Sequence, residues 1–185
     1  MLLFSNRREW HSDAEMNRFC WFLLCFTLWA ANAHSAELDT RAVAFYYPWY
    51  GNPATDGRFA NWNHAVAVRG EAPRSFPGGD DIGSNFYPSL GCYSVNDPNV
   101  LREHMRQLRQ AGVGVICASW WGRNTFTDRA LPAVFKAAEE AGVKVNFHIE
   151  PFPGRNAATT HDAIEYLTGT FGNSPACHRL ARFGK

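Results

Sequence analysis

The sequence predicts an α/β fold of the (β/α)8 TIM-barrel type, of which only the first three or so strand–helix units are present. Residues 42–49, 113–121 and 143–151 are interpreted as apolar strands separated by helices, which is typical of a parallel sheet covered on both faces. The run Ala-Gly-Val-Gly-Val at 111–115 recurs as Ala-Gly-Val-Lys-Val at 141–145, about one strand–helix–strand unit later. An open doubly wound sheet is the alternative, although the first strand lacks the Gly-x-Gly-x-x-Gly turn of its dinucleotide-binding form.

The first strand, residues 42–49, runs into Pro48-Trp49-Tyr50-Gly51, and a long loop is expected after it. Residues 52–97 show no sustained periodicity and are rich in Gly, Pro, Asn and Asp. A loop of this length inside a compact domain is more often functional than idle.

The first long helix has clear start and stop signals. Asp97 is expected to cap it, Pro98 to occupy its first position, and Gly112 to follow its last turn. Apolar residues recur at three- and four-residue spacing between these limits, which predicts one buried face.

Two further helices follow. The second is expected over residues 128–141, with Pro132 in its first turn and Gly142 after its end. The third is expected to begin near Thr159, where Thr159 and Asp162 form the pattern of a capping box.

Residues 37–185 are interpreted as the N-terminal part of one catalytic domain. Residues 173–185 read as a loop with no fourth strand. Because such a barrel needs about 250 residues, we expect the chain to be a piece of a longer protein or the product of a truncated gene. Unpaired sheet edges would then make it poorly soluble.

The N-terminal residues 1–36 have the pattern of a secretory signal peptide. Arg18 precedes an apolar run over 19–31, and Ala31-Asn32-Ala33 offers a cleavage site. The protein is therefore expected to be exported, as a secreted or periplasmic protein. An uncleaved signal that anchors it in a membrane is the alternative, although the run is short of the roughly 20 residues of a typical span. Residues 1–15 form an unusually long and polar segment before the signal pattern, which favours Met16 as the true first residue.

The composition limits the classes of partner that can be expected. The chain has 18 Lys and Arg against 17 Asp and Glu, which gives no electrostatic reason to expect nucleic acid or an anionic membrane surface. Aromatic residues make up 15%, including 7 Trp, and such rings serve either as core or as platforms for sugars. No cofactor is expected, and the oligomeric state is left open.

Three cysteines lie beyond the predicted signal. Cys92, Cys117 and Cys177 match no zinc spacing, and Cys117 lies in an apolar strand, where a buried thiol is expected. A Cys92–Cys177 disulfide is an option for an exported protein.

Chemistry is expected at the carboxyl ends of the strands, where both candidate architectures place their sites. These ends supply Tyr46, Tyr47, Trp120, Trp121, His148 and Glu150. Because strand side chains alternate, about half of the aromatic rings should be core, and we expect one of Trp120 and Trp121 to pack while the other contacts ligand. His148 and Glu150 share a face, so a purely structural pair with each other or with Arg155 is the alternative to a ligand-binding role.

The long loop supplies two more candidates, Asn63 and His64, in a segment where polar and aromatic residues interleave. This mixture suits recognition of hydroxyl groups, although Asx-turns and local packing would explain it too. Asp80-Asp81 has no further ligand at useful spacing, so no metal is predicted. The sequence has neither a Gly-x-Ser-x-Gly elbow nor a phosphate-binding loop.

Several motifs in order resemble glycoside hydrolase family 99, the endo-α-1,2-mannosidases and mannanases. They are Phe-Tyr-Tyr-Pro-Trp-Tyr-Gly at 45–51, Asp-Gly-Arg at 56–58, Trp-Asn-His at 62–64, Asp-Asp-Ile-Gly-Ser at 80–84, Phe-Tyr-Pro at 86–88, Asp-Pro at 97–98, Ser-Trp at 119–120 and Phe-His-Ile-Glu-Pro at 147–151. The resemblance implies a (β/α)8 barrel that cleaves internal α-mannosidic linkages of mannan or N-glycans, with retention of configuration and without a metal.

The resemblance also implies which residues act. In the family, one glutamate helps the substrate's own 2-hydroxyl to attack the anomeric carbon, and a second is the general acid and base. Both belong to a later Glu-x-x-Glu motif that is absent here, so no catalytic residue is assigned and the chain is expected to be inactive alone. Substrate binding carries over to Tyr46 or Tyr47, Trp120 or Trp121, and Glu150, and we expect Tyr46, Trp120 and Glu150 to meet at one rim. The alternative is a non-catalytic, glycan-binding barrel protein of surface-polysaccharide biosynthesis.

Overall fold

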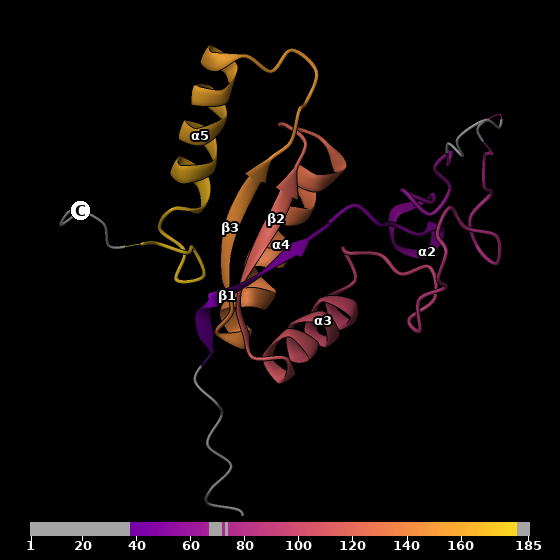
Figure 1. The fold of residues 1–185 in the computed structure, drawn as a ribbon, viewed down its shortest axis with the longest axis horizontal. Coiled ribbons are helices and arrows are strands. Elements are labelled where there is room, and N and C mark those ends of the chain that lie inside the picture. Colours follow the sequence, from indigo (N-terminus) through magenta and orange to yellow (C-terminus); the bar gives the residue numbers. More distant parts are fainter. Residues whose placement is uncertain (1–37, 67–71, 73, 181–185) are drawn as a thin grey trace, which may run out of the picture. The chain divides into compact units, whose positions relative to one another are not determined.

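The computed structural model describes residues 38–66, 72 and 74–180. Its helices and strands are, in chain order, β1 (Asp39–Tyr46), α2 (Pro53–Asp56), α3 (Pro98–Gln110), β2 (Val113–Trp120), α4 (Phe126–Ala141), β3 (Lys144–Ile149) and α5 (Ala157–Phe171) (Figure 1). The predicted signal peptide at 1–36 lies outside the described residues. Among the helices described, none is both long and apolar enough to cross a membrane.

The three strands form one parallel sheet in the order β1-β2-β3, which confirms the predicted α/β class. In the register, Phe45 of β1 lies beside Cys117 of β2, and Cys117 lies beside Asn146 of β3. The strand ends differ from the sequence-based ones by up to three residues. β1 ends before Pro48, which has no N–H to continue a ladder.

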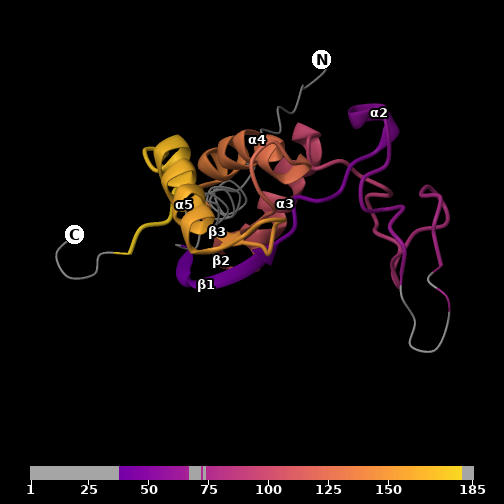
Figure 2. The same cartoon turned by 90° about the horizontal axis from the view of Figure 1, so that it is seen from above.

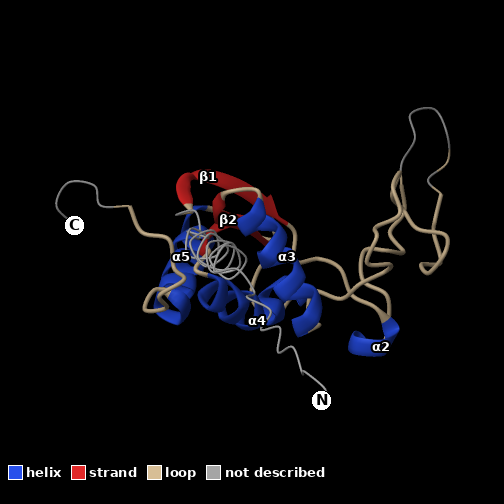
Figure 3. Ribbon diagram, turned by 90° about the horizontal axis from the view of Figure 1, so that it is seen from below, coloured by secondary structure: helices blue, strands red, loops and turns tan. Residues whose placement is uncertain are grey.

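Helices α3, α4 and α5 lie on one side of the sheet (Figures 2 and 3). Between them and the strands is a single apolar core, to which each of these elements contributes. Its largest fully buried members include Leu101, Met105, Ile116, Trp120, Leu131, Val134, Val145 and Leu167. The opposite face of the sheet carries the other half of the strand side chains, because successive residues of a strand point to opposite faces.

The helix signals were read correctly for α3 and incorrectly for α4. Asp97 caps α3 by accepting from the backbone N–H of Asn99 at 2.8 Å. Helix α4 starts two residues before the predicted position, because Thr125 supplies its cap. Pro132 is therefore inside the helix rather than in its first turn, where it removes one backbone hydrogen bond.

The third predicted cap is also wrong by three residues. Asn156, rather than Thr159, is the N-cap of α5, and its side chain accepts from the Thr159 N–H at 3.0 Å. The Thr159 hydroxyl in turn accepts from the Asn156 N–H at 2.9 Å. This reciprocal pair is the capping box, and Asp162 takes no part in it.

The segment after α5 forms no strand in its described residues, as expected, but it pairs with β3 at one residue, a contact that the sequence did not predict. Cys177 forms a parallel bridge with Val145 of β3, supported by hydrogen bonds from the Val145 N–H to the Ala176 carbonyl and from the His178 N–H to the Val145 carbonyl. Ala176 is only 1% exposed, so this short pairing also extends the core.

The long loop is held to the body of the domain by hydrogen bonds and ring contacts. Asp56, at the end of the short helix α2, accepts from the Asn52 backbone at 2.9 Å and from the Asn96 side chain at 2.8 Å. Trp62 is 4% exposed and packs against the rings of Tyr50 and Tyr93. The loop therefore has its own apolar packing. This is what the second interpretation of its sequence, Asx-turns and local packing, requires.

The proposed disulfide is not formed. Cys92 and Cys177 are free thiols, and the Cys92 thiol donates to the Gly79 carbonyl at 3.2 Å. Cys117 is half-buried rather than fully enclosed.

Asp128 connects the second strand to two helices through its buried carboxylate. One oxygen accepts from the Trp120 indole N–H at 2.8 Å, and the other accepts from the Asn124 backbone at 2.8 Å and the Tyr166 hydroxyl at 3.2 Å. Three donors on three segments thus converge on one side chain that is 8% exposed. Removing it leaves buried donors without an acceptor.

We therefore predict that Asp128→Ala lowers the free energy of unfolding by about 3 kcal/mol, measured by urea denaturation of the 185-residue chain. Glu139→Ala, an exposed change on the same helix, is the matched control and should stay within about 0.5 kcal/mol of the parent. Equal effects of the two changes would contradict the role assigned to Asp128.

Candidate functional site

The sheet face opposite the helices gathers polar and aromatic side chains from all three strands. We call it the open face and define it by Phe45 and Tyr47 from β1 and its end, Ser119 from β2, and His148 and Glu150 from β3 and its end. Ser119 and His148 are direct neighbours in the register. These residues share a face because they lie two apart along each strand, at matching heights in neighbouring strands.

A chain of hydrogen bonds crosses the open face. The Trp49 indole N–H donates to the Ser119 hydroxyl at 2.9 Å, and this hydroxyl donates to Glu150 Oε1 at 2.6 Å. The other carboxylate oxygen, Glu150 Oε2, lies 3.4 Å from His148 Nε2. Ser119 is completely buried and the Glu150 side chain is 13% exposed, so the carboxylate is held in one orientation while an edge stays accessible.

Aromatic rings surround this carboxylate. Phe45 stacks on Tyr47 with 5.9 Å between ring centroids and meets the His148 ring edge-on at 5.0 Å. Trp49 contacts Tyr47 at 4.6 Å and Trp121 at 6.2 Å. Tyr47 is 46% exposed, and Trp49 and Trp121 are partly exposed, so flat apolar surfaces flank an oriented acceptor.

Of each predicted aromatic doublet, the structure places one member on the open face and the other among the helices. Tyr47 and Trp121 share the open side with Glu150. Tyr46 and Trp120 point the other way, and Trp120 is 1% exposed and bound to Asp128. The expectation that Tyr46, Trp120 and Glu150 meet at one rim is therefore wrong for Tyr46 and Trp120, because neighbouring strand residues cannot share a face.

Comparison with known proteins identifies the family. The model for glycosyl hydrolase family 99 matches residues 37–182, which is most of the chain. The chain belongs to this family. It is similar to the glycoprotein endo-alpha-1,2-mannosidase of Mus musculus, with 41% identity over 149 residues that cover 74% of this chain and 32% of the relative. A human glycoprotein endo-alpha-1,2-mannosidase-like protein shares 40% identity over 162 residues, covering 80% and 35% of the two chains.

A solved structure gives the same answer for the fold. The GH99 endo-alpha-mannosidase from Bacteroides thetaiotaomicron superposes with a TM-score of 0.73 at 40% identity, over 78% of this chain and 44% of that one. The three parallel strands are therefore part of an α/β barrel of family 99, as the sequence predicted. The chain spans about a third of the length of the curated relatives it matches.

Asn63 and His64, the two loop candidates, are exposed, and in the described part of the molecule no hydrogen bond or ring contact joins them to the open face. His64 Nδ1 instead donates to the Asn61 carbonyl at 2.5 Å. Asn61 is the loop residue that reaches the site, because its amide donates to the Trp49 carbonyl at 2.8 Å. Asn61 was not selected from the sequence, and Ser119 was noted only at a strand end and in the Ser-Trp motif, since both act through partners distant along the chain.

Cys117, one step along β2 from Ser119 on the same face, is unsuited to act as a nucleophile. Burial and the nearby negative charge of Glu150 raise the pKa of the Cys117 thiol, which keeps it protonated. The group on the open face that can accept hydrogen bonds in its charged form is therefore the Glu150 carboxylate rather than the Cys117 thiol.

The described residues offer little to a metal ion. His161, Asp162 and Glu165 have ligand atoms within 4.8 Å of one another, but all three are exposed on one helix, and a hard cation needs about six or more ligands. Asp81, half of the acidic doublet in the loop, pairs with Arg74 at 2.8 Å.

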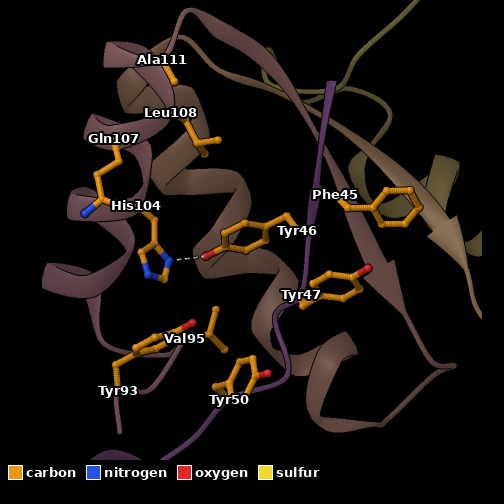
Figure 4. A pocket seen from close by; sticks show the side chains of 10 residues that line it. All are labelled: Phe45, Tyr46, Tyr47, Tyr50, Tyr93, Val95, His104, Gln107, Leu108 and Ala111. Atoms are coloured by element: carbon orange, nitrogen blue, oxygen red, sulfur yellow. Dashed lines mark hydrogen bonds between the residues drawn. The ribbon is translucent and has the colours of Figure 1, made fainter. Parts of the chain in front are cut away.

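Tyr46 lines a pocket of about 400 Å³ at the edge of β1 next to α3, and its ring leaves β1 on the opposite side from the Phe45 ring, which also lines the pocket (Figure 4). Its hydroxyl is hydrogen-bonded to His104 Nδ1 at 3.0 Å. Burial raises the pKa of the Tyr46 hydroxyl and lowers the pKa of His104, so both groups are neutral at pH 7. The pair fastens β1 to α3 and is a structural contact.

Stability is therefore expected to fall in acid because of His104. Its pKa in the folded protein lies below the ordinary value of 6.5, so the unfolded chain binds the proton more readily. The contribution of neutral His104 to the free energy of unfolding is complete above about pH 6.5. It is lost as the pH falls from there toward the lowered pKa of His104 in the folded protein. Urea midpoints measured between about pH 7.5 and 5.5 should fall less steeply for His104→Gln than for the parent chain. Parallel slopes for the two proteins would contradict this account.

The Ser119 hydroxyl is expected to couple Trp49 to Glu150. Ser119→Ala leaves the part-buried Trp49 indole N–H without this acceptor and Glu150 Oε1 without this donor, which should lower the free energy of unfolding by about 2 kcal/mol. In a double-mutant cycle with Glu150→Ala, the two losses should fall short of additivity by about 1 kcal/mol, because each change removes the same hydrogen bond. Strictly additive losses in urea denaturation would refute the coupling.

Proposed function

We propose that the protein is a glycosidase of the endo-α-1,2-mannosidase type and that its open face binds the mannose units of the substrate. The observation that carries this proposal is the Glu150 carboxylate, oriented by the buried Ser119 and flanked by exposed rings. The similar mouse protein is named glycoprotein endo-alpha-1,2-mannosidase, and the similar human protein is named glycoprotein endo-alpha-1,2-mannosidase-like protein. The matched bacterial structure is named an endo-alpha-mannosidase. Since the chain covers about a third of those curated relatives, the activity of the whole protein is inferred for it.

The chemistry of the open face suits a sugar. A pyranose has an apolar ring face that stacks on an aromatic ring, and Tyr47 and Trp121 supply such surfaces. Its hydroxyl groups need acceptors in fixed positions, and Glu150 supplies two oxygens whose charge strengthens each hydrogen bond. His148, beside Glu150 Oε2, limits the directions from which a hydroxyl can approach.

The reaction, on this proposal, retains the configuration of the anomeric carbon. One glutamate acting as base helps the substrate 2-hydroxyl to attack that carbon, and a second protonates the leaving oxygen and later activates water. Both belong to the Glu-x-x-Glu motif of the family, which this sequence lacks. Glu150 therefore binds and orients the sugar, and the 185-residue chain is expected to bind without turnover.

We also propose that residues 1–36 export the protein, which N-terminal sequencing of the secreted product would test.

The test is binding of α-1,2-mannotriose to the 185-residue chain by calorimetry, together with chromatography of the same mixture for released sugars. We expect saturable binding with no product. Glu150→Gln and Trp121→Ala should each weaken binding about tenfold or more, through loss of a charge-assisted hydrogen bond and of a stacking surface respectively. Glu140→Gln, an exposed change on α4, is the matched control and should bind like the parent.

Two results would contradict the proposal in different ways. Equal binding by the parent and both site variants would show that the open face is not the sugar site. Release of mannose or mannobiose by the chain would show that it carries its own catalytic residues.

A further inference from the structure

The two oxygens of the Glu150 carboxylate have different surroundings. Oε1 accepts from the Ser119 hydroxyl at 2.6 Å, and Ser119 is completely buried. Oε2 lies 3.4 Å from His148 Nε2, which is longer than an ordinary N–H···O hydrogen bond of about 2.7–3.2 Å. Among the described residues, no hydrogen bond to Oε2 is formed. Oε2 is therefore the carboxylate oxygen that is left for a ligand.

The His148 ring packs beside this oxygen on the open face. It meets the Phe45 ring edge-on, with 5.0 Å between the ring centroids. In the sheet register His148 is the direct neighbour of Ser119, so the backbone places it at the height of the hydroxyl that holds Oε1. The His148 side chain is 44% exposed, so its ring exchanges protons with the solvent, whereas that of Glu150 is 13% exposed.

Protonation of His148 changes the availability of Oε2. Histidine is the side chain whose charge ordinarily changes between pH 5 and 8. The imidazolium ion donates from both ring nitrogens, and a hydrogen bond between two charged groups shortens to about 2.7–2.9 Å. A movement of about half an ångström would bring the protonated ring to that distance from Oε2. The oxygen would then be occupied and its charge balanced, which makes it a weaker acceptor for a sugar hydroxyl.

The neighbouring titratable and charged groups keep their charge state over this pH range. The Cys117 thiol of β2 lies on the same face, and burial together with the charge of Glu150 raises its pKa, so it stays neutral. Tyr47, at the end of β1, supplies a phenol, a group that ordinarily ionises only in alkaline solution. Arg155, in the loop after β3, keeps its positive charge and donates to the Ile149 carbonyl at 2.9 Å.

We propose that His148 is a pH-dependent positioning residue, which leaves Glu150 Oε2 open to a mannose hydroxyl when neutral and occupies that oxygen when protonated. This inference rests on the proposed function. His148 acts through Glu150 and is not assigned a contact with a reacting atom. Sugar binding at the open face therefore weakens in mildly acidic solution, and by linkage a bound sugar makes His148 harder to protonate.

The test is calorimetric binding of α-1,2-mannotriose to the 185-residue chain at pH 7.5 and at pH 5.5. The parent should bind about fivefold more weakly at pH 5.5, because a histidine is ordinarily protonated there. His148→Gln keeps a polar side chain that does not change charge, so its affinity should be the same at both pH values. His161→Gln is the matched control, since it removes an exposed histidine of α5 that lies 3.8 Å from Glu165, and it should reproduce the fivefold difference of the parent.

NMR titration of the histidine rings gives a second readout, which a merely structural role would not move. Without sugar, Glu150→Gln should lower the pH at which the His148 ring gains its proton, because the imidazolium loses its charged neighbour. In the parent, saturation with mannotriose should lower the same pH by about half a unit or more, and the His161 ring should titrate as before.

The outcomes separate this inference from the proposed function. If the parent binds mannotriose equally at both pH values, or if His148→Gln shows the same acid loss as the parent, the role of His148 is refuted while the proposed function stands. Tighter binding at pH 5.5 would also refute it, since the imidazolium would then favour the sugar. If Glu150→Gln leaves the His148 titration unchanged, the pairing itself is absent. If the parent binds no sugar at pH 7.5, the proposed function fails and the inference fails with it.

Discussion

The alternation of side chains along parallel strands is the constraint on which the site depends. The ends of β1 and β2 each carry two adjacent aromatic residues, and the pleat sends one toward the helices and the other toward the open face. Tyr47 and Trp121 can flank Glu150 only because Tyr46 and Trp120 are turned away from it. A slip of one residue in any strand would exchange the two sets, so the register of the sheet decides which side chains are available to a ligand.

The buried hydroxyl of Ser119 converts this placement into a fixed geometry. A carboxylate at a strand end has several orientations available, and a hydrogen bond of 2.6 Å from a fully buried donor selects one of them. The same hydroxyl accepts from Trp49, so the Glu150 carboxylate and one of its flanking rings are oriented together. Rigid positioning of this kind lowers the entropy lost when a ligand binds.

Much of the fold was predictable because its signals are local. The cap and proline of α3 and the glycine turns before β2 and β3 act within a few residues, and the strand–helix order follows from them. The errors at α4 and α5 arose where two polar residues near the helix start could each be the cap. Thr125 caps α4 although Asp128 was taken as its start, and Asn156 caps α5 although Thr159 was taken as its cap. Sequence alone does not decide between such neighbours. The short pairing of Cys177 with β3 was missed because it depends on a neighbouring strand rather than on its own residues.

The site was predicted less well than the fold, for a physical reason that one strand illustrates. Residues 143–150 alternate strictly between apolar and polar, and this pattern already assigns Asn146, His148 and Glu150 to one face. The runs at 42–49 and 113–121 are largely apolar and aromatic without that alternation, so the pattern did not assign the members of their doublets to a face. Ser119 and Asn61 act through partners 31 and 12 residues away along the chain, a relation that only the folded structure reveals.

Tyr46 and Trp120, which point to the helix side of the sheet, hold the residues of the open face in place. The Tyr46 hydroxyl bonds to His104 of α3, and this contact fixes the end of β1 from which Tyr47 projects to the other side. Trp120 bonds to Asp128 of α4, and its carbonyl accepts from the Glu150 N–H at 2.9 Å, so the same residue sets the positions of Trp121 and of the carboxylate. A substitution at Tyr46 or Trp120 would thus change the geometry of the open face from the helix side of the sheet. Mutational effects at these two positions therefore cannot by themselves identify a ligand contact, whereas effects at Tyr47, Trp121 and Glu150, on the accessible side, can.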